Sequence, residues 1–131
     1  MKSSLSFLAI GATLIVVVAS GFGARAQDAL DPRIAAYDKG PATIDISKYP
    51  ADMKTSYKLF ATRCSKCHTI ARAINSEFVL EDEWERYVKR MMRKPGSGIS
   101  ANDGKTIFEF LAFDSRTRKK ALYDKRSKGG E

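Results

Sequence analysis

The chain has 131 residues, with 23 lysines and arginines against 15 aspartates and glutamates, which gives a formal net charge of +8. It contains two cysteines and one histidine. These are too few for a closed structural zinc site, which needs four ligands of these kinds. They also exclude any metal centre that takes two histidines from the same chain.

The first 26 residues are expected to form a secretory signal peptide. Lys2 supplies a positive start, residues 3–24 carry no charge, and Ala24-Arg25-Ala26 has the A-x-A form of a cleavage site. Cleavage would leave one small domain, located in the periplasm. An uncleaved membrane anchor is the alternative, because the uncharged run is just long enough to span a bilayer.

Two segments lead up to the cysteines. Residues 27–49 contain two prolines and a glycine and show little helical periodicity, so we expect an extended arm over the domain surface. Residues 50–63 are expected to be helical, since Pro50 suits a first turn and apolar residues recur at helical spacing. That apolar face comprises Met53, Tyr57, Phe60 and Cys64.

The stretch Cys64-Ser65-Lys66-Cys67-His68 has the form C-x-x-C-H, the attachment motif of a c-type haem. Its two thiols can each add to a vinyl group, and His68 can bind the iron. A thioredoxin-like pair would need a βαβ pattern, which does not surround this motif. A simple disulfide is the other alternative, since an exported protein can oxidise the pair. The motif predicts one covalent haem c, held by Cys64 and Cys67, with His68 as proximal ligand.

Residues 69–80 are expected to form a loop with some helical turn character. Arg72 and Asn75 lie in this loop, where each either reaches a haem propionate or is simply solvated. A second helix is expected over residues 81–93, opened by a capping box of Asp82 and Glu85. Its apolar stripe comprises Trp84, Tyr87, Val88 and Met91.

A third helix is expected to start at Ser100, with Asp103 at the matching capping-box position. Its buried side is supplied by Ile107, Phe108, Phe110, Leu111 and Phe113. The helix is expected to end near Asp114 or to continue into the tail.

The second axial ligand of the iron is expected to be a methionine, because the chain has no second histidine and haem iron in an electron carrier takes two axial donors. Met53 lies on the helix that leads into the motif and is poorly placed to reach the opposite face. Met91 lies on the apolar stripe of the second helix, whereas Met92 is rotated from it by roughly 100°. Periodicity therefore favours Met91, although a methionine on such a stripe often only packs in the core.

From Tyr49 to Asp114 the chain resembles class I c-type cytochromes of the small bacterial single-haem group. The resemblance rests on three patterns: Phe60-x-x-x-Cys64-x-x-Cys67-His68, Trp84-x-x-x-Val88-x-x-Met91, and Ile99-Ser100 followed by Ile107-x-x-Phe110-Leu111. It implies an all-α fold of about three main helices wrapped around one haem, with the first and last helices crossing.

The same resemblance implies Met91 as distal ligand. Trp84 and Arg72 are two further candidate haem contacts. Many family members carry a proline after the motif, and its carbonyl orients the histidine. Here no proline lies between His68 and Pro95, so another carbonyl is expected to hold the His68 ring.

The expected function is one-electron transfer by an exported monohaem cytochrome. Six-coordinate iron leaves no substrate site, so the chain is not expected to be an enzyme. Electrons would leave through the haem edge near Lys66. One alternative is a haem subunit of a larger periplasmic dehydrogenase or oxidase, with residues 27–49 as its interface. A peroxidase or gas sensor is a further alternative, against which the lack of a distal histidine counts.

The tail, residues 115–131, holds seven basic and two acidic residues, whereas residues 27–114 are nearly neutral. The charge therefore does not describe a basic, nucleic-acid-binding domain. We expect the tail to be either a solvated, flexible end or a steering element for acidic redox partners or an anionic membrane surface. The protein is expected to be a monomer or an accessory subunit, with a cytochrome domain over residues 50–114.

Overall fold

The computed structural model describes residues 30–129, so the expected signal peptide, residues 1–26, lies outside the described part. Within residues 30–129 all regular structure is helical, which confirms the expected all-α fold. The helices are α1 (Pro32–Asp38), α2 (Ala51–Cys64), α3 (Ala71–Ile74), α4 (Glu81–Met92), α5 (Ala101–Thr117) and α6 (Lys120–Lys128). None of these helices is long and apolar enough to cross a bilayer.

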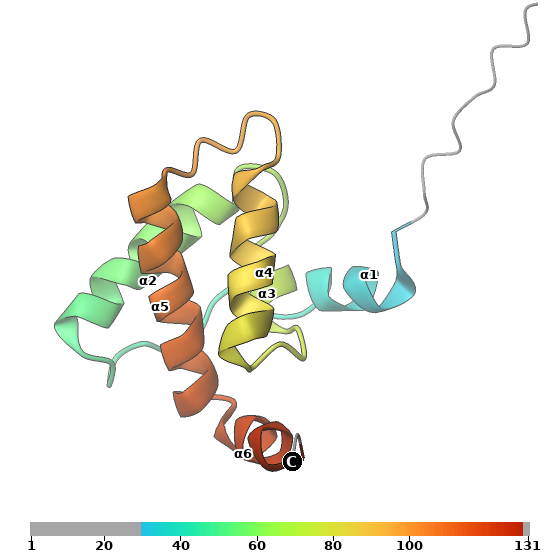
Figure 1. Ribbon diagram of the computed structural model, residues 1–131, viewed down its shortest axis with the longest axis vertical. Helices are drawn as coiled ribbons and strands as arrows, with labels where there is room; N and C mark the ends of the chain where they lie inside the picture. Colours follow the sequence, from blue (N-terminus) through green and yellow to red (C-terminus); the bar gives the residue numbers. More distant parts are fainter. Residues whose placement is uncertain (1–29, 130–131) are drawn as a thin grey trace, which may run out of the picture.

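Three main helices build the core. Helix α2 crosses α5, and α4 runs beside α5 (Figure 1). Each supplies an almost fully buried aromatic residue: Phe60 from α2, Trp84 from α4 and Phe110 from α5. The rings of Phe60 and Phe110 stack with their centroids 5.4 Å apart. Because α2 ends at Cys64, this crossing fixes where the cysteine motif begins.

The helix starts follow local hydrogen bonding. Helix α5 begins with the expected capping box, in which Ser100 Oγ accepts from the Asp103 amide at 3.1 Å. The expected Asp82–Glu85 box at α4 is wrong, because the N-cap is Leu80, two residues before Asp82, which places Glu83 in the third helical position. Glu83 Oε2 accepts from the backbone amides of Val79 and Leu80, both at 3.0 Å.

The N-terminal arm differs from the extended segment expected from the sequence. Asp31 caps α1 by accepting from the Arg33 amide at 2.8 Å, and Pro32 fills the first helical position, where its missing N–H costs nothing. Helix α1 then lies against α3 (Figure 1). The arm is therefore helical over residues 32–38 because local capping outweighs its weak apolar periodicity.

The C-terminal segment is helical, so it differs from the solvated, flexible end that was one of the two predictions for the tail. Helix α5 continues to Thr117, and Ser115 is fully buried. Helix α6 folds back toward the start of α4 (Figure 1), where Arg126 donates to Glu83 at 2.6 Å and to the Glu77 carbonyl at 2.8 Å. The tail is thus a packed part of the domain.

Most of the basic side chains in this segment are held by contacts within the chain. Arg116, Arg118, Lys120 and Arg126 form ion pairs with Glu81, Asp114, Asp124 and Glu83. Lys119 donates to the Ser76 carbonyl at 2.7 Å and lies 5.4 Å from the centre of the Trp84 ring. Its burial lowers the pKa of Lys119 to about 8. Most of the positive side chains of this segment are therefore paired or hydrogen-bonded within the chain.

The Ser115 hydroxyl is predicted to stabilise the join between α4 and α5. Trp84 Nε1 donates to Ser115 Oγ at 2.8 Å in the interior, and Ser115→Ala leaves that buried indole N–H without its acceptor. We expect the free energy of unfolding to fall by about 1–3 kcal/mol, measured by urea unfolding. Ser127→Ala, on the exposed face of α6, is the matched control; equal stability of the two variants would contradict the prediction.

Candidate functional site

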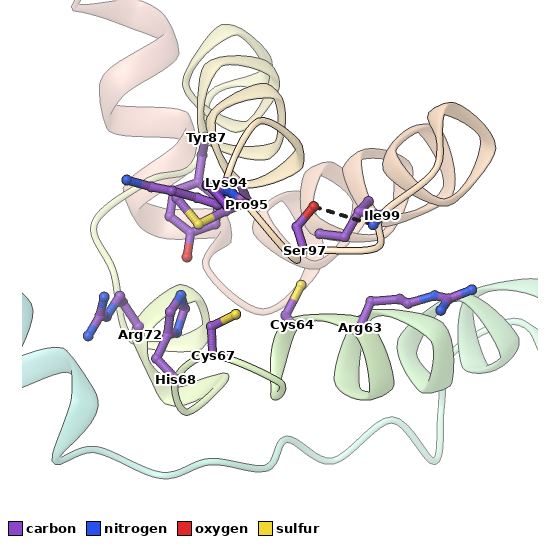
Figure 2. A pocket seen from close by; sticks show the side chains of 11 residues that line it. Arg63, Cys64, Cys67, His68, Arg72, Tyr87, Lys94, Pro95, Ser97 and Ile99 are labelled. Carbon is purple, nitrogen blue, oxygen red and sulfur yellow. Dashed lines mark hydrogen bonds between the residues drawn. The ribbon is translucent and has the colours of Figure 1, made fainter.

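A cavity of about 290 Å³ lies at the cysteine motif. One wall is the end of α2 and the turn after it, and the other is the end of α4 with residues 94–99 (Figure 2). The lining residues are Arg63, Cys64, Cys67, His68, Arg72, Tyr87, Met91, Lys94, Pro95, Ser97 and Ile99. The cavity thus collects side chains from segments about thirty residues apart in sequence.

Both motif cysteines line the cavity as free thiols, so the disulfide alternative is not the state of this structure. Cys64 is half-buried at the last turn of α2, while Cys67 is exposed. Burial, with a smaller contribution from the neighbouring Cys67, raises the pKa of the Cys64 thiol to about 12. Cys64 therefore stays a neutral thiol that suits an apolar partner.

The His68 ring is held by the backbone of the next residue. His68 Nδ1 lies 3.0 Å from the Thr69 carbonyl oxygen, and since a carbonyl can only accept, Nδ1 carries the proton. The lone pair is then on Nε2, the nitrogen available to a metal. The expectation that a carbonyl other than that of a proline holds this ring is met by Thr69.

The two methionines at the end of α4 face different surroundings. Met91 lines the same cavity as the two cysteines and His68. Met92 packs against α5 instead: a Cβ on Gly104 would lie 2.5 Å from Met92 Sδ, so a glycine is needed there to admit the thioether. Met53 packs against the core cluster and does not line the cavity.

The other residues expected to contact the haem lie in different places, and only some of them line the cavity. Arg72 lines the cavity and forms an ion pair with Asp38 of the arm. Asn75 points at the arm, where its side-chain amide donates to the Tyr37 and Pro41 carbonyls. Trp84 does not line the cavity and lies in the core behind it. Of these three candidates, Arg72 is the one that the structure brings to the site.

Sequence reasoning missed several residues of the site. Tyr87 looked like core packing, yet its hydroxyl points into the cavity (Figure 2), and burial raises its pKa to about 12, which keeps it protonated. Lys94, Pro95, Ser97 and Ile99 were recognised only as a turn and its flank. Positive φ angles at Gly96 (75°) and Gly98 (61°) bend that segment over the cavity.

The donor set fits a covalently attached haem. Two thiols sit at the spacing of the attachment motif, one imidazole nitrogen is left open, and a thioether lies on the lining contributed by another helix. Histidine and methionine together are the axial pair of cytochromes c. Within residues 30–129 no cluster of three or more histidine, cysteine, aspartate or glutamate side chains offers a second metal site.

Comparison with known proteins agrees with this chemistry. The family described as photosystem P840 reaction-centre cytochrome c-551 matches residues 7–114. A "Cytochrome c" of Chlorobaculum tepidum is 40% identical over 75 residues, which cover 53% of this chain and 36% of the relative. The chain thus spans about a third of the length of that relative. No solved structure was found to match.

The match to the family extends over most of the chain and includes the C-x-x-C-H motif, His68 and Met91. Cytochromes c are haem-bearing proteins. The chain therefore belongs to the cytochrome c-551 family of c-type cytochromes.

Proposed function

We propose that this protein is an exported carrier of single electrons that holds one haem c through Cys64 and Cys67, with His68 and Met91 as the axial ligands. When bound, the haem supplies the iron that takes up and releases one electron. The observation that carries the proposal is the shared cavity: His68 and Met91 line it together with both cysteines, while Met92 does not.

The chain's own residues each have a defined part. Cys64 and Cys67 supply the two sulfur atoms for thioether bonds. The Thr69 carbonyl fixes the tautomer and direction of the His68 ring. Met91 contributes a thioether, which favours reduced iron relative to a second imidazole. The lining is mainly apolar, and an apolar surrounding also favours the less charged, reduced state.

Electron exchange is proposed to take place where the site opens to solvent. Cys67 is exposed there, as are Lys66 beside it and Lys94 on the opposite wall. A positive rim of this kind suits acidic redox partners and brief docking through a small interface. Because most of the tail's charges are paired within the chain, Lys66 and Lys94 are better placed to guide such partners. Contact of α6 with an anionic membrane surface stays a prediction.

A second candidate is a haem subunit of a larger redox assembly. The matched family is described as a cytochrome of a photosystem reaction centre, and the Chlorobaculum tepidum relative is much longer than this chain. These observations favour a fixed electron-transfer subunit more than the dehydrogenase or oxidase subunit expected from sequence. Co-purification of the tagged chain with a large membrane or periplasmic protein would favour this candidate over a free carrier.

The periplasmic location is likewise a proposal. It rests on the apolar N-terminal run and the A-x-A site, together with the attachment motif. The family match begins at residue 7 and so includes most of that run, which keeps the uncleaved anchor as the alternative. The mass of the mature chain separates the two, because cleavage after Ala26 leaves Gln27 as the first residue.

Each motif cysteine is expected to be needed for stable haem attachment. Cys64→Ala or Cys67→Ala removes one covalent anchor and leaves the haem free to escape from a cavity that opens to solvent. We expect little covalently bound haem in either variant, measured by haem staining of denatured protein on a gel. Ser65→Ala, between them, is the control and should attach haem normally; full attachment in both cysteine variants would exclude this motif as the site.

Met91 is expected to be the distal ligand. Met91→Ala should keep the haem attached but abolish the weak sulfur–iron absorption band of the oxidised protein and lower the reduction potential, since a thioether ligand raises it. Met92→Ala is the matched control and should leave both unchanged, because its sulfur packs at Gly104. Loss of the band in Met92→Ala alone would show that the end of α4 has a different register.

Charge at the cavity mouth is expected to set the rate of reaction with anionic redox agents. Lys66→Glu with Lys94→Glu should slow oxidation of the reduced protein by hexacyanoferrate(III) several-fold at low salt. The difference should shrink as the ionic strength approaches 1 M, where screening reaches about 3 Å. Lys125→Glu with Lys128→Glu, on α6, makes the same change of charge as a control; an equal effect of the two pairs would indicate dependence on net charge alone.

A further inference from the structure

The N-terminal arm reaches the edge of the haem site through one ion pair. Asp38, the last residue of α1, accepts from Arg72 twice, with Oδ1 to Nε at 3.0 Å and Oδ2 to Nη2 at 2.5 Å. The two side chains are each 22% exposed. Arg72 in turn lines the cavity on the same wall as His68 and Cys67 (Figure 2). The Asp38 carboxylate of the arm therefore contacts a side chain, that of Arg72, which itself lines the cavity.

The position of Asp38 is set by how the arm docks on α3. Asn75, three residues after Arg72 and so close to the same helical face, donates to the Tyr37 carbonyl at 3.1 Å and to the Pro41 carbonyl at 3.0 Å. Gly40 fits tightly beneath it: a Cβ there would lie 2.4 Å from Asn75 Nδ2. These contacts flank Asp38 on both sides in sequence and hold it against Arg72.

A charge in this place acts on any redox centre in the cavity. A carboxylate favours the more positive, oxidised state, and a guanidinium favours the reduced state. Because the pair is mostly withdrawn from solvent, both fields are screened less than those of surface charges. The hydrogen bonds from Arg72 hold the pKa of the Asp38 carboxyl below its usual value, so the carboxylate is ionised at neutral pH.

We propose that Asp38 is a positioning residue of the redox site: the docked arm brings its carboxylate against Arg72 and thereby lowers the reduction potential of the haem, so that the potential depends on the arm being in place. This inference rests on the proposed function, because it requires the haem to occupy the cavity lined by Arg72. It gives the arm, residues 30–49, a role beyond covering the domain.

The test is a charge cycle on the pair, read as the midpoint potential of the full-length holoprotein. Asp38→Asn should raise the potential, because Arg72 keeps its charge without its counter-ion. Arg72→Gln should lower it, because the carboxylate remains. The double variant should return toward the wild-type value. At a fixed applied potential, each single change should alter the ratio of reduced to oxidised protein by up to about tenfold, which is about 59 mV for a one-electron couple.

Three further variants separate charge from structure. Asp38→Glu keeps the charge and should stay near the wild-type potential. Asp31→Asn removes another arm carboxylate, one that pairs with Arg33 and does not line the cavity, and should produce no shift. Gly40→Val forces the arm away from Asn75 and should raise the potential as Asp38→Asn does, with no further rise when the two are combined.

The results distinguish a failure of this inference from a failure of the proposed function. Shifts of the same sign in Asp38→Asn and Arg72→Gln, or an unchanged potential in Asp38→Asn, would overturn the inference. If Asp38→Asn yields no holoprotein, Gly40→Val and Arg72→Gln decide by the opposite signs of their shifts. The absorption spectrum is recorded first on each protein: a wild type without covalent haem refutes the proposed function and the inference together. A normal spectrum with no shift in the variants refutes only the inference.

Discussion

The packing of α2 across α5 is the constraint on which the rest of the structure depends. Phe60 and Phe110 stack at the crossing, and the residue four places after Phe60 is Cys64, the first cysteine of the C-x-x-C-H motif. Helix α4 packs on the same α5, which sets the position of Met91. The two helices that carry the walls of the cavity, α2 and α4, thus both pack against α5. Their separation follows from how each of these helices packs on α5.

The segments outside this core are tied to it by polar contacts. The C-terminal segment closes over the α3–α4 connection through Arg118, Lys119 and Arg126, which donate to the backbone carbonyls of Ile74, Ser76, Phe78 and Glu77. The arm attaches to α3 through Asp38 and through the Asn75 side chain. Both attachments meet the stretch that directly follows His68. The stretch after His68 contains one short helix, α3. Its carbonyls and side chains form hydrogen bonds with the N-terminal arm and with the C-terminal segment.

This arrangement changes how the charge of the protein is understood. A count along the sequence places most of the positive charge in the tail, but in the folded chain Arg116, Arg118, Lys120 and Arg126 are neutralised by acidic partners. Two of these partners, Glu81 and Glu83, come from the start of α4, where negative charge is also favoured by the helix dipole. At the cavity mouth, Lys66 and Lys94 carry exposed positive charge.

The sequence by itself determined which chemical groups the site can use. The C-x-x-C-H motif, the single histidine and the helical spacing of Phe60, Trp84 and Met91 are local patterns, and they were enough to predict an all-α haem protein and to prefer Met91 over Met92. Tertiary structure decided what depends on residues far apart in the chain. The Asp38–Arg72 pair and the Trp84–Ser115 hydrogen bond leave no periodic signal. The docking of α6 also depends on tertiary structure. Ion pairs such as Arg126–Glu83 join residues that come close together only when α5 packs against α4.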